Sequence, residues 1–171
     1  MATQVTENKG AQEVIAFARG RQSLEQSVWY NGWLTTFLAT GQDTQGQFAL
    51  MEQVTRNNNV PPPHIHHRED EVFYVLEGEV TFFVGDRTIK ATPGTLAFVP
   101  RGVVHSFALD SELVRFLVLL TPAGFEAFFK ECSVPAPSMT LPPPAEMSDS
   151  ERQNMMAVAP KYGTEFVLPK R

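Results

Sequence analysis

The chain contains one cysteine, no long hydrophobic run and no cluster of basic residues. A single thiol, Cys132, excludes an internal disulfide and agrees with a reducing compartment. A membrane span needs about 18 consecutive apolar residues, and residues 1–5 lack the basic start of a signal peptide, so we expect a soluble cytoplasmic protein with no membrane partner. The net charge of −5, without clustered Lys and Arg, argues against a nucleic-acid partner.

Length and composition indicate one domain. With 171 residues, of which 43% are hydrophobic, the chain can build one core but not two comfortable ones. Internal repeats are absent, which excludes a duplicated double barrel. We expect an N-terminal arm over residues 1–26, partly disordered or pairing with the barrel or a partner, then a barrel core over residues 27–121. Residues 122–171 should form a helix, a proline-rich strap, a second short helix and a tail, all packing on the barrel.

The middle of the chain consists of short apolar segments separated by turn residues, which is typical of an all-β sandwich or barrel. Pairs such as Gly85-Asp86 supply positive φ angles or side chains that bond their own backbone. The run at residues 71–76 is apolar on both faces after its first residue, so we expect this strand to be covered on each side. The expected strands are residues 29–39, 47–54, 71–76, 79–84, 88–91, 95–99, 103–108 and 113–120.

The C-terminal part has a different pattern. Three phenylalanines at helical spacing predict a short helix over residues 123–132, and we expect them to pack against the barrel rather than to line a substrate site. Five prolines within residues 135–144 predict an extended strap. A second helix is expected to begin at Ser148, because Glu151 completes a capping box, and residues 162–168 could add one strand.

Three of the four histidines and one glutamate fall into a single register. His64 and His66 alternate along a strand and therefore point to the same face; Glu71 follows five residues later, and His105 comes after a Pro-Arg-Gly turn. Each histidine alone would be interpreted as a solvated loop residue. Glu71 would be a buried carboxylate, whose energetic cost a neighbouring cation removes. Together the four side chains predict a metal site.

These residues resemble the two motifs of the cupin superfamily. The first matching stretch runs through His64, His66, Glu71 and Gly78, and the second through Gly94, Pro100, Gly102 and His105. Asn58 stands where the first motif usually begins with glycine, and Asn can adopt the left-handed conformation of that turn. Leu109 stands where the second motif usually ends with asparagine; because leucine cannot replace the hydrogen bonds of an amide, the sequence does not determine how this strand ends.

The resemblance implies a single jelly-roll barrel, with short C-terminal helices, that binds one divalent transition metal through His64, His66, Glu71 and His105. Imidazole and carboxylate ligands suit Fe, Ni, Mn, Co and Cu, and Zn is also possible. Four protein ligands on an octahedral ion leave two positions for substrate or dioxygen. Asp70 and Glu71 are adjacent, so only one can point at the metal, and Glu71 has the superfamily's spacing to Gly78. His67 should face away from His66, toward the surface.

Apolar side chains share a face with the proposed ligands, which favours a small-molecule pocket, although they could equally just fill the barrel. The candidate substrate contacts are Phe73, Val75, Val103 and Phe107. Three further aromatic residues either cap the mouth of the pocket or seal a subunit contact, namely Trp29, Tyr30 and Trp33. The apolar strand at residues 72–76 is also compatible with a contact between subunits, and we expect a homodimer.

Three segments are similar to bacterial quercetin 2,3-dioxygenase-type cupins: the prolines at 61–63, the run at 69–78 and the segment at 121–126, with further similarity in the tail. This resemblance implies oxygenative ring cleavage of a flavonol or related enolic aromatic by dioxygen, with release of carbon monoxide. Glu71 would take the enol proton, with a pKa raised by apolar surroundings, and the metal would hold the enolate. Two alternatives stay open: a non-redox cupin, such as an isomerase or polyketide cyclase, and a non-catalytic small-molecule-binding cupin.

Overall fold

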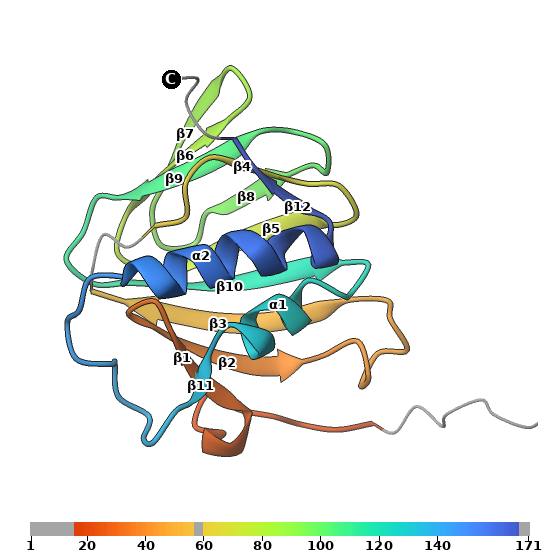
Figure 1. Cartoon of the computed structure of the whole chain (residues 1–171), viewed down its shortest axis with the longest axis vertical. Helices are drawn as coiled ribbons and strands as arrows, with labels where there is room; N and C mark the ends of the chain where they lie inside the picture. Colours follow the sequence, from red (N-terminus) through yellow and green to blue (C-terminus); the bar gives the residue numbers. More distant parts are fainter. Residues whose placement is uncertain (1–15, 57–59, 168–171) are drawn as a thin grey trace, which may run out of the picture.

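The computed structural model describes residues 16–56 and 60–167, and it consists of two antiparallel sheets with short helices (Figure 1). The predicted all-β architecture is confirmed. Asn58 and residues 1–15 of the expected arm lie outside the described residues, and the division into three parts stays a prediction. In the described part of the chain, no helix is long and apolar enough to cross a membrane; the cytoplasmic location also stays a prediction.

The two sheets contain seven and five strands. The larger sheet contains, in spatial order, β11 (Val134–Pro135), β1 (Ser27–Tyr30), β2 (Trp33–Ala39), β3 (Ala49–Thr55), β10 (Val114–Thr121), β5 (Asp70–Glu77) and β8 (Leu96–Val99). The smaller sheet contains β12 (Thr164–Phe166), β4 (His64–His66), β9 (His105–Leu109), β6 (Val80–Val84) and β7 (Arg87–Ala91). The helices are η1 (Leu24–Gln26), α1 (Glu126–Glu131), α2 (Asp149–Val158) and η2 (Ala159–Tyr162).

The strand predicted over residues 29–39 is wrong as one element, because the chain turns back inside it. Asn31 and Gly32 have φ angles of 48° and 81°, and they join β1 to β2 in a hairpin. Positive φ at both central residues is the requirement of the two-residue turn that matches strand twist, and Asn-Gly is the pair that meets it most easily. The apolar residues on both sides hid this turn signal in the sequence.

The end of β9 is intact, although Leu109 stands where the motif usually has asparagine. Leu109 pairs with Val80 in the ladder between β9 and β6. The next residue, Asp110, supplies the missing side-chain bond: its carboxylate accepts the Thr81 hydroxyl at 2.6 Å. A polar side chain shifted by one position therefore closes the strand without asparagine.

Gly78 is required by the close approach of two chain segments. Its φ is +78°, and a Cβ placed on it would lie 2.2 Å from the Leu113 carbonyl oxygen. An L-residue would meet both backbone strain and a collision with main-chain atoms, so the turn between β5 and β6 needs glycine. This turn fixes where β5 ends, six residues after Glu71.

The expectation that β5 is covered on both faces is wrong for the single chain. Its inward side chains, such as Phe73, are buried, but Tyr74 on the other face is 40% exposed. Leu96 and Phe98, on the neighbouring edge strand β8, are 59% and 51% exposed. The outer face of these two strands is therefore an exposed apolar surface.

The C-terminal segment follows the predicted order of helix, strap, helix and strand. The first helix is shorter than predicted, and the strap is irregular except for Pro135, which pairs with β1 at the sheet edge, where a missing N–H is tolerated. Figure 1 shows α2 crossing in front of the sheets before the chain returns as β12. There Thr164 pairs with His66 and Phe166 pairs with His64. Leu168, at the end of the expected tail strand, lies outside the described residues.

The capping box of α2 is present as predicted. The Ser148 hydroxyl accepts the Glu151 N–H, and the Glu151 carboxylate accepts the Ser148 N–H. Replacing Ser148 with alanine is expected to lower the free energy of unfolding by about 1 kcal/mol, because one N-terminal N–H loses its acceptor. Urea denaturation measures this, with Ser148→Asp as a control that keeps an acceptor. An alanine variant as stable as the aspartate variant would contradict the role of the cap.

Candidate metal centre

The structure brings the four predicted ligand residues together from three strands. His64 and His66 come from β4, Glu71 from β5 and His105 from β9. His64 and His105 face each other in the ladder of the smaller sheet, and Glu71 reaches across from the larger one. All four side chains are buried, and one ligand atom from each lies within 4.8 Å of the others. The cluster therefore lies between the two sheets.

Glu71 is at the centre of this cluster. Its Oε2 atom lies 3.3 Å from Nε2 of His105 and 3.7 Å from Nε2 of His66. The other ring nitrogen of His105 donates to the Val103 carbonyl at 3.1 Å, and that of His64 donates to the Pro62 carbonyl at 2.9 Å. Because a carbonyl oxygen only accepts, Nδ1 of each of these two rings carries a proton, and the neutral form of each ring has a bare Nε2.

The cluster's electrostatics favour neutral His64 and His66 and an ionised Glu71, whereas for His105 the adjacent Glu71 carboxylate outweighs the effect of burial and raises the pKa. Burial, together with the neighbouring imidazoles, lowers the pKa of His64 to about 3, and burial also lowers the pKa of His66. Burial alone would raise the pKa of Glu71, but His105 and the other imidazoles outweigh it and lower the pKa. The expectation that apolar surroundings raise this pKa is therefore wrong, because three imidazoles stabilise the carboxylate.

The donor set fits a divalent first-row metal ion. In the described part of the chain, the Nε2 atoms of His66 and His105 are buried without a hydrogen-bond partner. Buried polar atoms normally have partners, so two orphaned imidazole nitrogens beside a carboxylate are an observation that a cation would explain. Three nitrogen donors and one oxygen donor, with no thiolate, suit the metals expected from the sequence.

A cavity of about 370 Å³ opens beside the cluster. Three of the four donors, those of β4 and β5, are among its lining residues. Eight of its eighteen other lining residues are aromatic, and α2 with the strap before it contributes Met155, Arg152, Met147 and Glu146. The cavity therefore combines a polar end with apolar walls, as small-molecule sites usually do.

Two of the four candidate substrate contacts line this cavity, namely Phe73 and Phe107. Val75 and Val103 are not among its lining residues: Val75 is fully buried in the core, and Val103 packs against the core from the side. Alternation gave the right face of β5 for Val75, but it carries no information on depth along the strand, and Val103 precedes β9, which begins at His105. Substrate contact stays a prediction for the two phenylalanines.

Sequence reasoning missed other parts of the wall. Phe125, Phe128 and Phe129, expected only to pack against the barrel, also line the cavity. Tyr30 and Trp33 line it as well, whereas Trp29 donates its indole N–H to the Thr140 carbonyl at 2.8 Å. The sequence did contain a signal for the three phenylalanines. An aromatic stripe at helical spacing can line a pocket as well as pack against a barrel.

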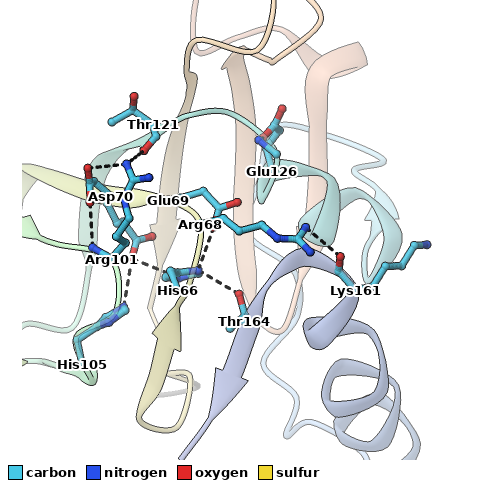
Figure 2. A network of polar contacts seen from close by, with 12 residues as sticks. His66, Arg68, Glu69, Asp70, Arg101, His105, Thr121, Glu126, Lys161 and Thr164 are labelled. Carbon is cyan, nitrogen blue, oxygen red and sulfur yellow. Dashed lines mark hydrogen bonds and ion pairs between the residues drawn. The ribbon is translucent and has the colours of Figure 1, made fainter.

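The residues adjacent to the ligands point elsewhere. The Asp70 carboxylate forms an ion pair with the Arg101 guanidinium at 2.8 Å, and this contact lowers the pKa of Asp70 to about 2 (Figure 2). The structure therefore turns Glu71, and not Asp70, toward the histidines. His67 is exposed, and its Nε2 lies 3.0 Å from Glu165, which agrees with the expected surface position.

Comparisons with known proteins identify similar chains. A family model described as Cupin domain matches residues 51–120, the segment that contains all four donors. Quercetin 2,3-dioxygenase of Bacillus subtilis is 32% identical over 127 residues, which are 73% of this chain and 38% of that protein. The chain spans only about a third to a half of the length of the curated relatives that it matches.

Solved structures share the fold. A predicted oxalate decarboxylase from Thermotoga maritima superimposes with a TM-score of 0.54 at 17% identity, covering 63% of this chain and 99% of that one. An RmlC-like cupin from Shewanella frigidimarina gives a TM-score of 0.53 at 19% identity, covering 68% and 96%. At these identities the likeness concerns the fold alone, which is the expected jelly roll.

Proposed function

This chain belongs to the cupin superfamily, and on that premise we propose that it is a metal-dependent dioxygenase that cleaves a flavonol or a related enolic aromatic. One observation carries the proposal: buried metal-type donors form one end of a cavity that eight aromatic side chains also line. A planar aromatic substrate would be held by ring contacts, with its polar edge at the donors. The similarity to the quercetin 2,3-dioxygenase of Bacillus subtilis supports this choice of substrate.

Within this proposal, the chain's own residues bind, orient and move a proton. His64, His66, Glu71 and His105 would hold one divalent ion, and Fe, Ni, Mn, Co, Cu and Zn all stay candidates. When bound, such an ion supplies charge stabilisation for the enolate oxygen and an electronic link to dioxygen. The aromatic walls, including Phe73 and Phe107, orient the ring and exclude water.

Glu71 is the base in this scheme. Its lowered pKa makes it a carboxylate at neutral pH, able to accept the proton of the substrate's enol hydroxyl at once. Dioxygen is the oxidant: both its atoms enter the ring-opened product, and the carbon that bore the enol hydroxyl leaves as carbon monoxide. Glu71 then returns the proton to the product oxygen, which closes the proton balance.

The test couples elemental analysis of the purified protein to oxygen uptake with a panel of flavonols. We expect about one transition-metal ion per chain, oxygen consumption that depends on the flavonol, and no turnover under nitrogen. Turnover under nitrogen would overturn the redox reaction in favour of an isomerase or cyclase. Flavonol binding without oxygen consumption would overturn it in favour of a binding protein.

We also propose that the protein is a homodimer in which the outer face of β5 and β8 packs against the same face of a second copy. Three exposed apolar side chains of this face, Tyr74, Leu96 and Phe98, lie on adjacent strands, so two copies related by a two-fold axis could pack these side chains against each other. Leu96→Asp is expected to convert a dimer into a monomer, because dimerisation would bury its carboxylate without a partner.

Light scattering coupled to size exclusion measures the mass of the wild type and of this variant. Phe83→Asp is the matched control, since Phe83 is an exposed apolar residue of the smaller sheet and is 42% exposed. The control should stay dimeric. A monomeric wild type at micromolar concentration would overturn the proposal.

A further inference from the structure

The three histidines of the cluster differ in what fixes their ring protons. His64 and His105 each donate Nδ1–H to a backbone carbonyl, which cannot donate in return. The Nδ1 atom of His66 instead lies 3.0 Å from the hydroxyl of Thr164 on β12. A hydroxyl both donates and accepts, so this contact alone does not decide which nitrogen of His66 carries the proton.

The tautomer of His66 that cannot bind a metal ion, with its proton on Nε2, has a favourable partner inside the cluster. Its Nε2 lies 3.7 Å from Oε2 of Glu71, so a proton on Nε2 would point at a carboxylate. In that state Thr164 would donate to Nδ1, and Nε2 could not bind a metal ion. A second influence is needed to keep the proton on Nδ1.

Glu69 is placed to supply it. Its side chain is 2% exposed, its Oε2 atom lies 4.0 Å from Nδ1 of His66, and that oxygen has no hydrogen-bond partner among the described residues (Figure 2). The nearby arginines are engaged elsewhere: Arg101 pairs with Asp70, and Arg68 donates to the Lys161 carbonyl. A buried oxygen of the Glu69 carboxyl group is thus left beside the outer nitrogen of His66.

We propose that Glu69 is a positioning residue that, with Thr164 as hydrogen-bond acceptor, keeps the His66 proton on Nδ1 and leaves Nε2 bare for a metal ion. Glu69 at Nδ1 thereby opposes the attraction of Glu71 for a proton on Nε2 of the same ring. Carboxylates behind metal-binding histidines act in this way by fixing the tautomer and raising ligand basicity. The inference rests on the proposed metal binding but not on the substrate or the reaction.

The arrangement also connects the C-terminal segment to the cluster. Thr164 belongs to β12, which follows α2 and η2, and it pairs with His66 across the ladder. The same segment lines the cavity through Arg152 and Met155 of α2. The tail of the chain therefore contributes to the wall of the site and to the orientation of one ligand.

The first test observes the ring protons of His66 directly in metal-free protein. Long-range proton–nitrogen spectra of histidine-labelled chain distinguish the two tautomers, and loss of signals in His66→Gln assigns them. The wild type is expected to carry the proton on Nδ1, and Glu69→Gln to shift a large fraction of it to Nε2. Glu126→Gln is the matched control, since this buried carboxylate accepts from Gly41 and Gly124 instead.

The second test measures the affinity for Co²⁺ alone by competition with a chelator. Glu69→Gln is expected to weaken binding by about 10- to 100-fold, the usual effect of removing such a partner. Thr164→Val should weaken it as well, whereas Thr164→Ser, which keeps the hydroxyl, should restore it. Glu126→Gln should bind Co²⁺ as the wild type does, even if it unfolds more easily.

The two measurements separate this inference from the proposed reaction. Unchanged His66 tautomer and unchanged Co²⁺ affinity in Glu69→Gln would overturn it, whatever the protein's activity. Equal losses of affinity in Glu69→Gln and Glu126→Gln would also overturn it, because they would indicate a general effect of removing a buried carboxyl group. A protein that binds Co²⁺ but consumes no oxygen would overturn the dioxygenase proposal and leave this one supported.

Discussion

Replacing Glu71 with glutamine is expected to lower the rate of flavonol-dependent oxygen uptake by about 10²- to 10⁴-fold, the usual contribution of a positioned acid or base. Glutamine has nearly the same shape and keeps one oxygen donor, so the fold and most of the bound metal should remain. The amide cannot accept the enol proton. Initial rates of oxygen uptake, metal per chain and circular dichroism together measure the effect.

Asp70→Asn is the matched control for this variant, because Asp70 is the adjacent acid and could not be distinguished from Glu71 by type alone. It pairs with Arg101 at the surface, where an ion pair contributes at most about 1 kcal/mol. Its oxygen uptake should stay within about twofold of the wild type. A Glu71→Gln variant that keeps the wild-type rate would show that another group takes the proton.

The lowered pKa of Glu71 changes how this loss is interpreted. The sequence predicted a base made stronger by apolar surroundings, whereas three imidazoles make it a weaker and fully ionised base. A weaker base needs a more acidic substrate, and a cation at the enol oxygen provides that acidity. The carboxylate is therefore expected to accept the proton, and the ion that it helps to bind is expected to make the enol more acidic.

The fold could be predicted where the signals are local. Alternation and turn residues placed most strands within a few residues, and the capping box at Ser148 located α2. The Asn31-Gly32 hairpin was missed because apolar residues continue on both sides of it. The short strand β11 was missed because two residues become a strand only through their pairing with β1, which lies far away in sequence.

The candidate site could likewise be predicted where its signals are local. It could not be predicted where it depends on contacts between segments far apart in the sequence. His64 and His66 lie two residues apart on one strand, so strand geometry alone aims them together, and Glu71 follows five residues later on β5 of the other sheet. Thr164 reaches His66 only because β12 folds back onto β4, across 98 residues of chain. Its hydroxyl, like the aromatic wall around α1, is set by tertiary packing that no local pattern encodes.

Removal of the metal by a chelator is expected to abolish oxygen uptake and to lower the melting temperature by roughly 10 °C. Metal present at about 1,000 times its dissociation constant stabilises the native state by about 4 kcal/mol. In a chain of this size, each kcal/mol shifts the melting temperature by about 2–4 °C. Because three buried imidazoles and a carboxylate lose their common partner, the loss should appear in stability and in activity together.

Adding back single metal ions then separates binding from chemistry. Zn²⁺ has no redox chemistry, so it is expected to restore the melting temperature more fully than oxygen uptake, whereas a redox-active ion should restore both. His105→Gln should bind little metal and should resemble the chelated protein, while His67→Gln, outside the cluster and paired with Glu165, should resemble the wild type. If the chelated protein kept both its melting temperature and its turnover, the four buried side chains would have no ion in common. Glu71 would then be a buried carboxylate stabilised by its histidines alone.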